Sequence, residues 1–375
     1  MAGIYLHIPF CKGKCAYCDF YSVGNIKLKE IFIEAICKEI ELQKDYLKGE
    51  YIQTIYFGGG TPSLLSPEEL EEIIEQILKY FDVEKSNEIT LEANPDDLTK
   101  EYLKAIKEIG VNRLSIGIQS FNNGDLLRMK RKHSADQAIR SVQYAQEQGF
   151  KNISIDLIYG LPELSLEKWE ENIKQTLNLN IQHISAYHLT IEPKTLFYRY
   201  YQKNNLNLPS EDESLNQFGK LIEKTEQKGF LHYEISNFAK DGFLSLHNTN
   251  YWADVKYLGL GPSAHSYNLT SRQWNIQNLR GYLDEILKGK IPCEEENLSQ
   301  NEKFNDYLIT SLRTMWGLNT EKIEHEFGID FKKHIEKKSS RFLKENLLIK
   351  SGNNFKLTKK GIFISDHIIL SFLKD

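Results

Sequence analysis

An alternation of buried strands and amphipathic helices over residues 4–189 constrains the fold more than any other feature of this sequence. The strand segments are short apolar runs, whereas the helix segments place apolar residues three and four positions apart. The predicted strands span 4–8, 51–57, 88–93, 113–118, 152–158 and 183–189, and the predicted helices span 28–46, 97–109, 134–148 and 166–177, with another opening at 66–69. Strands that alternate with helices form parallel βαβ units. The six strands predict an α/β fold, a partial (β/α)6 TIM-like barrel with its functional residues at the carboxyl ends of the strands.

Composition narrows the class of protein. With 375 residues, 41% of them hydrophobic, the chain can build a large core and an additional unit. The net charge of −5 gives no reason to expect nucleic acid as a partner. The five cysteines, three of them in one loop, indicate a reducing compartment such as the cytoplasm. No apolar run is long enough for a transmembrane segment, and we expect no signal peptide.

The cysteines Cys11, Cys15 and Cys18 directly follow the first predicted strand. Thiolates at this spacing can converge on one soft metal centre. A zinc ribbon would need a second cysteine or histidine pair downstream, and a disulfide framework needs an even count. The pattern therefore predicts an iron–sulfur cluster, and three thiolates leave one iron of a [4Fe–4S] cube without a protein ligand. Cys37 and Cys293 are isolated and are predicted to be packing residues.

Further candidate residues lie at or near the ends of the later strands. They are Gly59, Gly60 and Thr61 after the second strand, Glu92 at the end of the third, Gln119 at the end of the fourth, Arg131 in the segment between the fourth and fifth strands, and Asp156 within the fifth. Glycines let a backbone approach a small ligand closely, but they also form tight turns. Glu92 fits either a ligand contact or a solvated loop. Asp156 interrupts an apolar strand, which is costly unless its carboxylate is paired.

The cysteine spacing, with Tyr17 just before the third cysteine, resembles the radical S-adenosylmethionine (SAM) superfamily. The resemblance implies that the cysteines hold a [4Fe–4S] cluster whose fourth iron is chelated by SAM. Together with the stretches around Gly60, Glu92 and Asp156, the chain resembles one family over nearly its whole length, that of the oxygen-independent coproporphyrinogen III dehydrogenases and the heme chaperones. That resemblance implies SAM contacts at Tyr5, Tyr17, Gly59, Gly60, Thr61, Glu92, Gln119, Arg131 and Asp156.

Three features favour the heme chaperone branch of that family. Phe20 stands where the enzymes have a further cysteine, and only four residues precede Tyr5, where the enzymes have a longer arm. The segment from His247 to Trp252 matches the H-N-x-x-Y-W motif of heme chaperones. The resemblance makes His247 the candidate heme ligand, since histidine is a common axial ligand. Without it, ordinary packing is the preferred interpretation. His265, in a glycine-rich turn, is interpreted as part of a structural loop.

The sequence divides into a radical SAM core over residues 1–235, a connecting region over 236–300 and a C-terminal domain over 301–375. The C-terminal part predicts helices at 304–314, 320–327 and 331–345, a hairpin at 347–357 and a closing helix at 358–373. Helices followed by a hairpin predict an α+β winged-helix-like domain. The family resemblance implies that it covers the barrel opening.

The first functional hypothesis is a heme chaperone that binds a [4Fe–4S] cluster, SAM and heme and delivers heme to apoproteins of the respiratory chain. An electron donor such as flavodoxin or ferredoxin is implied if SAM is cleaved. The alternative is an oxygen-independent coproporphyrinogen III oxidase, in which a deoxyadenosyl radical abstracts hydrogen from propionate side chains with loss of CO2. A third hypothesis is a radical SAM enzyme that acts on an unrelated substrate.

Overall fold

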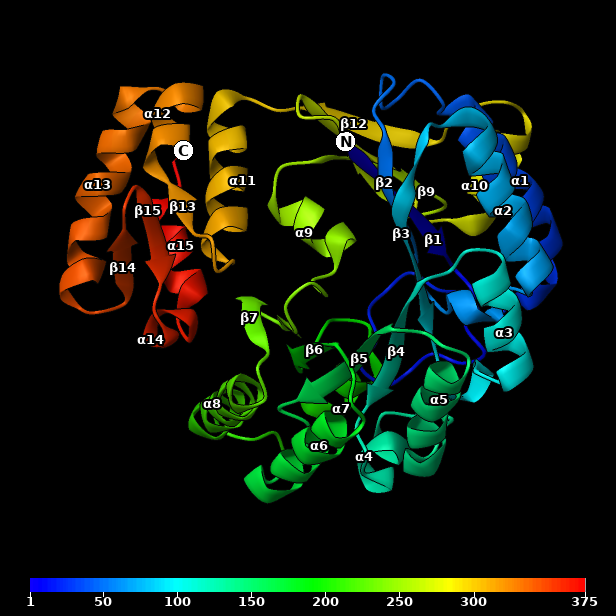
Figure 1. The fold of residues 1–375 in the computed structure, drawn as a ribbon, viewed down its shortest axis with the longest axis horizontal. Helices are drawn as coiled ribbons and strands as arrows, with labels where there is room; N and C mark the ends of the chain where they lie inside the picture. Colours follow the sequence, from blue (N-terminus) through cyan, green and yellow to red (C-terminus); the bar gives the residue numbers. More distant parts are fainter. Residues whose placement is uncertain (375) are drawn as a thin grey trace.

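The computed structural model describes residues 1–374, and Asp375, the last residue of the expected C-terminal domain, lies outside them. Its central feature is an open, twelve-stranded mixed sheet (Figure 1). Its first six strands are parallel and follow chain order: β1 (Ala2–Ile8), β2 (Ile52–Gly59), β3 (Val83–Ala93), β4 (Arg113–Gln119), β5 (Asn152–Tyr159) and β6 (His183–His188). This order confirms the predicted strands and the α/β fold class.

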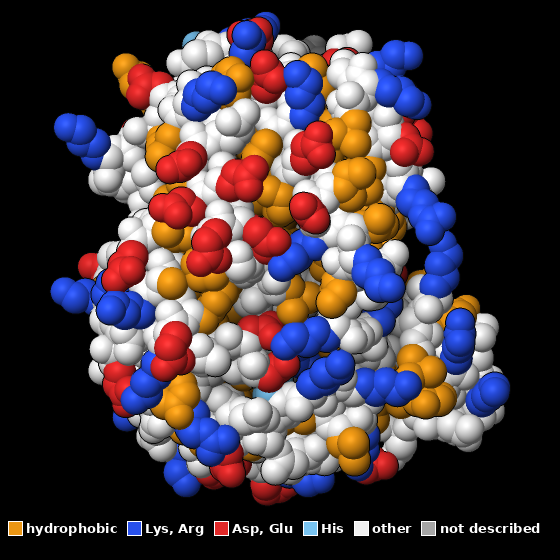
Figure 2. Space-filling model, turned by 90° about the vertical axis from the view of Figure 1, so that its right-hand side faces the viewer, with side chains coloured by type: hydrophobic (Ala, Val, Ile, Leu, Met, Phe, Trp, Pro, Cys, Tyr) orange, Lys and Arg blue, Asp and Glu red, His pale blue; other side chains and the backbone are white. Residues whose placement is uncertain are grey.

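Helices connect these strands and cover the outer side of the sheet (Figure 1). They are α1 (Lys29–Leu42), α2 (Pro67–Tyr80), α3 (Lys100–Glu108), α5 (Ala135–Glu147) and α6 (Leu166–Asn178). The side chain of Ser66 caps α2 in a capping box, as the S-P-E-E sequence predicts. Acidic side chains crowd the upper part of the face seen in Figure 2, and basic side chains gather below them. The outer faces of these helices are therefore solvated.

Short helical segments occupy the loops at the carboxyl ends of the strands. They are η1 (Ile26–Leu28), η2 (Pro62–Leu64), η3 (Pro95–Asp97) and α4 (Asn123–Arg128). The segment between β4 and α5 is a plain polar linker in the sequence prediction. It forms α4 because the Asn122 side chain accepts hydrogen bonds from the backbone N–H groups of Gly124 and Asp125. These segments shape the edge of the sheet at which the candidate residues converge.

Six later strands extend the sheet at both ends: β7 (Leu231–Glu234), β8 (Asn237–Ala239), β9 (Lys256–Leu260), β10 (His265–Tyr267), β11 (Ser271–Asn275) and β12 (Cys293–Asn297). β9 pairs parallel to β1, and β10–β12 follow it as an antiparallel meander. At the other end, β8 pairs antiparallel to β6 and β7 forms the edge. Residues 256–297, described in the sequence as a connecting region, thus belong to the same sheet as the core.

The remaining helices of this part are α7 (Leu196–Gln202), α8 (Glu211–Gln227), α9 (Leu246–Trp252) and α10 (Leu279–Leu287). α9 lies on the inner side of the sheet, next to β1 and β2 (Figure 1). Its first turn is held by Glu88 of β3, whose carboxylate accepts hydrogen bonds from the backbone N–H groups of Leu246 and His247 at 3.1 and 3.2 Å. The H-N-x-x-Y-W motif therefore forms a helix buried within the curve of the sheet.

The C-terminal domain contains α11 (Gln300–Leu312), β13 (Leu318–Asn319), α12 (Thr320–Phe327), α13 (Ile329–Lys344), β14 (Leu348–Ser351), β15 (Asn354–Leu357), α14 (Lys359–Ile362) and α15 (Ser365–Phe372). Its three-stranded sheet has the order β13-β15-β14. This confirms the winged-helix-like α+β composition. The expected closing helix is divided into α14 and α15.

The two parts of the chain have separate cores. Buried apolar side chains form one cluster over residues 2–286 and another over 304–372. The C-terminal domain contacts both ends of the large sheet: Thr314 pairs with Glu234 of β7, and Asp306 forms an ion pair with Arg272 of β11. It thus lies across the open side of the sheet, as expected. Within residues 1–374, no helix combines the length and apolar content needed to cross a bilayer.

Candidate cluster and cofactor site

The loop after β1 carries the three predicted cluster ligands. Cys11, Cys15 and Cys18 are half-buried and have free thiols. The backbone N–H of Cys11 donates to the Val23 carbonyl at 3.1 Å, and the Val23 N–H donates to the Pro9 carbonyl at 2.7 Å. The loop is therefore closed at its base and returns to the carboxyl end of the strand from which it departs.

The loop forms one wall of a cavity of about 430 Å³ at the carboxyl ends of the parallel strands. This volume lies within the range of small-molecule sites, roughly 300–1,000 Å³. Eleven predicted residues line the cavity: Cys11, Cys15, Tyr17, Cys18, Gly59, Gly60, Thr61, Glu92, Gln119, Arg131 and Asp156. The parallel topology brings these residues together, because each strand contributes the residues at its carboxyl end to the same edge of the sheet.

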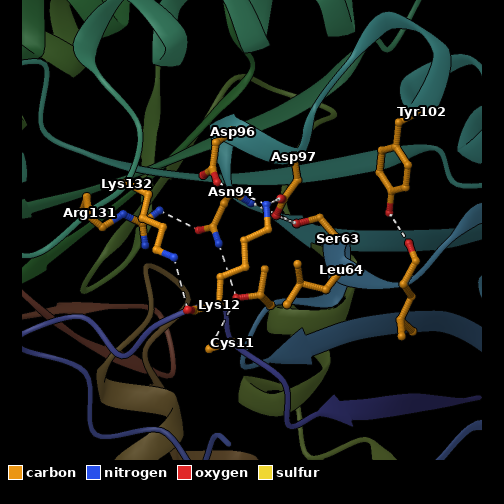
Figure 3. A network of polar contacts seen from close by, with 12 residues as sticks. Cys11, Lys12, Ser63, Leu64, Asn94, Asp96, Asp97, Tyr102, Arg131 and Lys132 are labelled. Atoms are coloured by element: carbon orange, nitrogen blue, oxygen red, sulfur yellow. Dashed lines mark hydrogen bonds and ion pairs between the residues drawn. The ribbon is translucent and has the colours of Figure 1, made fainter. Parts of the chain in front are cut away.

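Two of the thiols contact polar side chains from other loops. Figure 3 shows the first of them, Cys11, together with Asn94 and Arg131. The Cys11 sulfur lies 3.3 Å from the Thr61 hydroxyl, and Nη1 of Arg131 donates to the Cys15 sulfur at 3.6 Å. Asn94 lies between these two groups. Its Nδ2 donates to Thr61 at 3.3 Å, and its Oδ1 accepts from Nη2 of Arg131 at 2.6 Å. The sequence analysis did not single out Asn94, although it stands two residues after Glu92.

Arg131 also donates from Nη2 to the Gly117 carbonyl at 2.5 Å. Its Nε is buried and has no hydrogen-bond partner among the described residues. A buried N–H without a partner is costly unless a ligand satisfies it. The guanidinium of Arg131, facing the cavity, therefore fits a bound carboxylate such as that of SAM.

The glycines after β2 are required by both the turn and the close packing. Gly59 has a φ of +104°, and a Cβ at this position would lie 2.8 Å from the ring of His7. A Cβ on Gly60 would lie 2.7 Å from the carbonyl oxygen of Phe10, in the cysteine loop. Glycine at both positions lets the loop after β2 pack directly against the base of the cysteine loop.

Two carboxyl groups reach the cavity from β3 and β5. Glu92 accepts a hydrogen bond from the Tyr56 hydroxyl at 2.8 Å, and Asp156 accepts one from Ser115 at 3.0 Å. Burial and the nearby charge of Asp156 raise the pKa of Glu92 to about 7. Burial also raises the pKa of Asp156. The Asp156 carboxyl is hydrogen-bonded, as its position in an apolar strand requires, and the packed position of Glu92 is not that of a solvated loop.

The donor set fits a cluster better than a single ion. In the described part of the chain, no group of three or more His, Cys, Asp or Glu side chains is arranged to hold a metal ion. A [4Fe–4S] cube has a different requirement, because each cysteine thiolate binds a different iron. Burial raises the pKa of the Cys18 thiol to about 11, so cluster binding must displace its proton. Three thiols around one cavity satisfy the ligand requirement of such a cluster.

The structure places the other two predicted residues outside the cavity lining. Tyr5, on β1, lies behind the wall: its hydroxyl is 3.3 Å from Nδ1 of His7, and its ring stacks on Tyr56 with a centroid separation of 6.1 Å. His247 lies close to Gly3, near the start of β1. Gly3 and Ile8 are five residues apart, which corresponds to about 17 Å along a strand. His247 therefore lies toward the amino ends of the strands, and Tyr56 separates its ring from the cavity residue Glu92.

The imidazole of His247 is enclosed and is only 2% exposed. Its Nδ1 is 2.8 Å from the Thr54 hydroxyl, its Nε2 is 3.0 Å from the Tyr251 hydroxyl, and its ring stacks on Tyr56 at 4.9 Å. Burial lowers its pKa to about 3, which keeps the ring neutral. A neutral imidazole is the form that binds metals, but in this structure both ring nitrogens have hydrogen-bond partners.

Lysines around the cavity mouth are a further feature that motif analysis overlooked. Lys12, Lys14, Lys130 and Lys132 are exposed, and all four line the cavity. Their position next to Cys11, Cys15 and Arg131 in the sequence was the available signal. Phe20 lines the same mouth with 68% of its side chain exposed. The entrance thus combines basic groups with one exposed aromatic ring.

Comparison with known proteins identifies the class. Residues 5–176 match the family model described as the radical SAM superfamily, and residues 298–364 match the HemN C-terminal domain. The solved structure of coproporphyrinogen III oxidase (HemN) from Escherichia coli, described as a radical SAM enzyme, is similar with a TM-score of 0.86. The match covers 100% of this chain and 90% of that chain, and at 22% identity it shows the fold. The chain is a radical SAM protein with a HemN-type C-terminal domain.

Two full-length relatives specify the family further. The chain is 34% identical to the heme chaperone HemW of Lactococcus lactis, over 99% of this chain and 97% of that protein. It is also 34% identical to the heme chaperone HemW of Bacillus subtilis, over 100% and 99% of the two chains. The chain belongs to the HemW family. Membership of the radical SAM superfamily implies a [4Fe–4S] cluster and SAM as its cofactors.

Proposed function

We propose that this chain is a heme chaperone that binds a [4Fe–4S] cluster through Cys11, Cys15 and Cys18, binds SAM in the adjoining cavity, and carries heme to apoproteins. The observation that carries the proposal is the similarity, over the whole length of the chain, to proteins named heme chaperones. The cavity lined by all three thiols supports the cofactor part. The H-N-x-x-Y-W motif from His247 to Trp252 supports the heme part.

Within the cavity, this chain's own residues would bind and orient SAM. When bound and reduced, a three-cysteine cluster supplies one-electron chemistry at its open iron. The unpartnered Nε of Arg131 suits the SAM carboxylate, and Glu92 suits its amino group or ribose hydroxyls. Gly59 and Gly60 keep side chains out of the loop that would contact the ligand.

Further residues complete the proposed SAM site. Thr61, Gln119, Asp156 and Tyr17 line the same cavity, and Tyr5 supports its wall from behind. Gln119 has a φ of +70°, an uncommon backbone conformation for a residue other than glycine. Strained backbone of this kind is found at ligand sites, where surrounding contacts hold it in place.

His247 is the proposed heme ligand, and its surroundings define what ligation requires. Coordination of iron by Nε2 would replace the hydrogen bond to the Tyr251 hydroxyl. The helix α9 that carries both residues has only seven residues and contacts α11 of the C-terminal domain. Because His247 is only 2% exposed, heme ligation by this residue requires α9 to move relative to β1 and β2.

The proposal includes partners that the family resemblance implies. The heme acceptors are apoproteins of the respiratory chain, and the protein works in the cytoplasm, consistent with its free thiols. If SAM is cleaved, a low-potential carrier such as flavodoxin or ferredoxin supplies the electron. The exposed lysines at the cavity mouth support an acidic carrier, because opposite charges steer association.

Heme titration of the reconstituted chain tests the proposal. We expect stoichiometric heme binding, followed by the Soret absorption band, with His247→Ala reducing affinity by at least tenfold. His265→Ala is the matched control, because His265 is another histidine of the sheet extension, with its ring stacked on Trp274 at 6.1 Å. The heme affinity of His265→Ala should equal that of the unmodified chain. Conversion of coproporphyrinogen III to protoporphyrinogen IX by the same preparation would instead establish the enzyme function and reject the chaperone proposal.

A further inference from the structure

Asn94 hydrogen-bonds the two side chains that contact the thiols, Thr61 and Arg131, and these partners define the orientation of its amide. Figure 3 shows Asn94 beside Arg131. A guanidinium has only donors, so the Asn94 atom 2.6 Å from Nη2 of Arg131 must be the carbonyl oxygen Oδ1. The amide nitrogen Nδ2 then faces Thr61 at 3.3 Å. Arg131 thus fixes which side of the Asn94 amide points toward Thr61.

This orientation determines the direction of the next hydrogen bond. The Thr61 hydroxyl accepts from Asn94, and it has a single proton of its own. The Cys11 sulfur lies 3.3 Å from the same oxygen. Because a cluster-bound cysteine is a thiolate without a proton, the Thr61 proton is directed onto the sulfur. Asn94 therefore makes Thr61 a donor to Cys11.

The second donor depends on the same amide. Nη2 of Arg131 is engaged by Asn94 and by the Gly117 carbonyl, which leaves Nη1 directed at the Cys15 sulfur at 3.6 Å. The backbone N–H of Asn94 donates to Ser63 at 3.2 Å and anchors the residue at the start of η3. One anchored amide thus holds the donors of two separate thiols.

The cysteine loop is joined to the same segment from outside. Lys12, next to Cys11, forms an ion pair with Asp97 of η3 and lies 3.4 Å from Asp96. The Ser63 hydroxyl donates to Asp97 at 2.7 Å. η3 and the cysteine loop are therefore connected by hydrogen bonds near the thiols and by ion pairs at the surface. These contacts limit the movement of one relative to the other.

We propose that Asn94 is a positioning residue that directs the Thr61 and Arg131 hydrogen bonds onto the thiolates of Cys11 and Cys15 and so raises the reduction potential of the bound cluster. Reduction adds negative charge to the cluster, and donors to its sulfurs stabilise the reduced state more than the oxidised state. The inference rests on the cluster part of the proposed function. According to this inference, Thr61 and Arg131 donate hydrogen bonds to the cysteine sulfurs in addition to any contact with SAM.

Midpoint potentials measured without SAM test this inference. The reconstituted chain is reduced stepwise with dithionite, one electron per cluster, and the reduced cluster is followed by electron paramagnetic resonance. In Asn94→Asp the new carboxylate still accepts from Arg131, but it also accepts the Thr61 proton and removes it from Cys11. We expect about a tenfold smaller equilibrium constant for reduction, which corresponds to a midpoint about 59 mV more negative.

Thr61→Val removes the same donor with little change of shape, so it should lower the midpoint similarly, and Thr61→Ser should restore it. Tyr102→Phe is the control, because it removes only the hydrogen bond to the Leu65 carbonyl in the neighbouring network, and it should leave the midpoint unchanged. The inference is overturned if Asn94→Asp and Thr61→Val keep the unmodified midpoint while holding full iron and sulfide. Failure of the unmodified chain to take up a cluster would instead reject the cluster part of the proposed function.

Discussion

Glu92→Gln should abolish a pH dependence of SAM binding that the unmodified chain shows below neutral pH. The Glu92 carboxyl lies in the cavity against the Tyr56 hydroxyl, and burial together with the charge of Asp156 raises its pKa to about 7. The ionised carboxylate accepts hydrogen bonds from the amino group or ribose hydroxyls of SAM more strongly than the protonated carboxyl does. Acidification therefore weakens binding as Glu92 takes up a proton.

The magnitude follows from this pKa. With a pKa of about 7, the ionised fraction of Glu92 is about one half at pH 7 and about one thirtieth at pH 5.5. SAM affinity should thus rise about fifteenfold over this range. The α-amino group of SAM titrates at about pH 7.7, and because this titration belongs to SAM it affects the unmodified chain and Glu92→Gln equally. In Glu92→Gln, affinity should be low and the difference of about fifteenfold due to Glu92 should be absent.

Isothermal titration calorimetry of the cluster-loaded chain at several pH values measures the effect, with iron content checked at each pH. Asp19→Asn is a suitable control, because Asp19 is an exposed carboxyl at the mouth of the same cavity and its removal should preserve the slope. The reasoning is refuted if the slope persists in Glu92→Gln, since the titrating group must then be another one.

The raised pKa of Glu92 also predicts that the stability of the fold depends on pH in the absence of SAM. The pKa of Glu92 is higher in the folded chain than the value of 4.5 expected for an exposed glutamate. Its contribution to the free energy of unfolding is therefore fully present below pH 4.5 and is lost as the pH rises to about 7. Urea unfolding at pH 4.5 and at pH 7 measures this loss. Between these pH values the free energy of unfolding of Glu92→Gln should fall less than that of the unmodified chain.

Three further predictions concern the loops and the heme site. Glu39→Ala should lower the free energy of unfolding by about 3–5 kcal/mol in urea titrations, because the buried Glu39 carboxyl accepts three hydrogen bonds at 2.6–2.7 Å. Its removal would leave the buried Gly261 N–H and Tyr282 hydroxyl without this acceptor, whereas Asn275 keeps its bond to the Gly261 carbonyl. Gly60→Ala should prevent iron uptake, measured as iron per chain, because the new Cβ would lie within 2.8 Å of two backbone oxygens, whereas Gly24→Ala, in open space, should load normally. Tyr251→Phe should increase heme affinity about two- to tenfold in spectrophotometric titrations, because it removes the hydrogen bond that occupies Nε2 of His247. An unchanged affinity would mean that heme ligation does not use this nitrogen.

The parallel core was predictable because its signals are local. A short apolar run followed by an amphipathic helix repeats along residues 2–188, and each repeat is visible in a short window of sequence. The cysteine loop and the glycines after β2 are likewise contiguous motifs. Parallel pairing then places every strand end at one edge, so eleven of the cavity-lining residues could be named from motifs and the family resemblance, whereas Asn94 and the four lysines at the mouth were missed.

The ends of the sheet were not predictable in this way. β9 pairs with β1, more than 200 residues away in the chain, and β8 and β10 each contain only three residues. Such short segments carry no alternation pattern, and their pairing depends on edges that exist only after the core has formed. For the same reason the sequence analysis described residues 236–300 only as a connecting region.

The sequence by itself determined the strand–helix order, the three thiols and the family motifs, because these are properties of neighbouring residues. Only the tertiary structure decided which of those residues meet. It placed Asn94 between the donors to Cys11 and Cys15, and it placed His247 outside the cavity lining, near Gly3 of β1 and against the ring of Tyr56. The physical reason is that a side chain's partners are set by strand register and by loops that approach from distant parts of the chain.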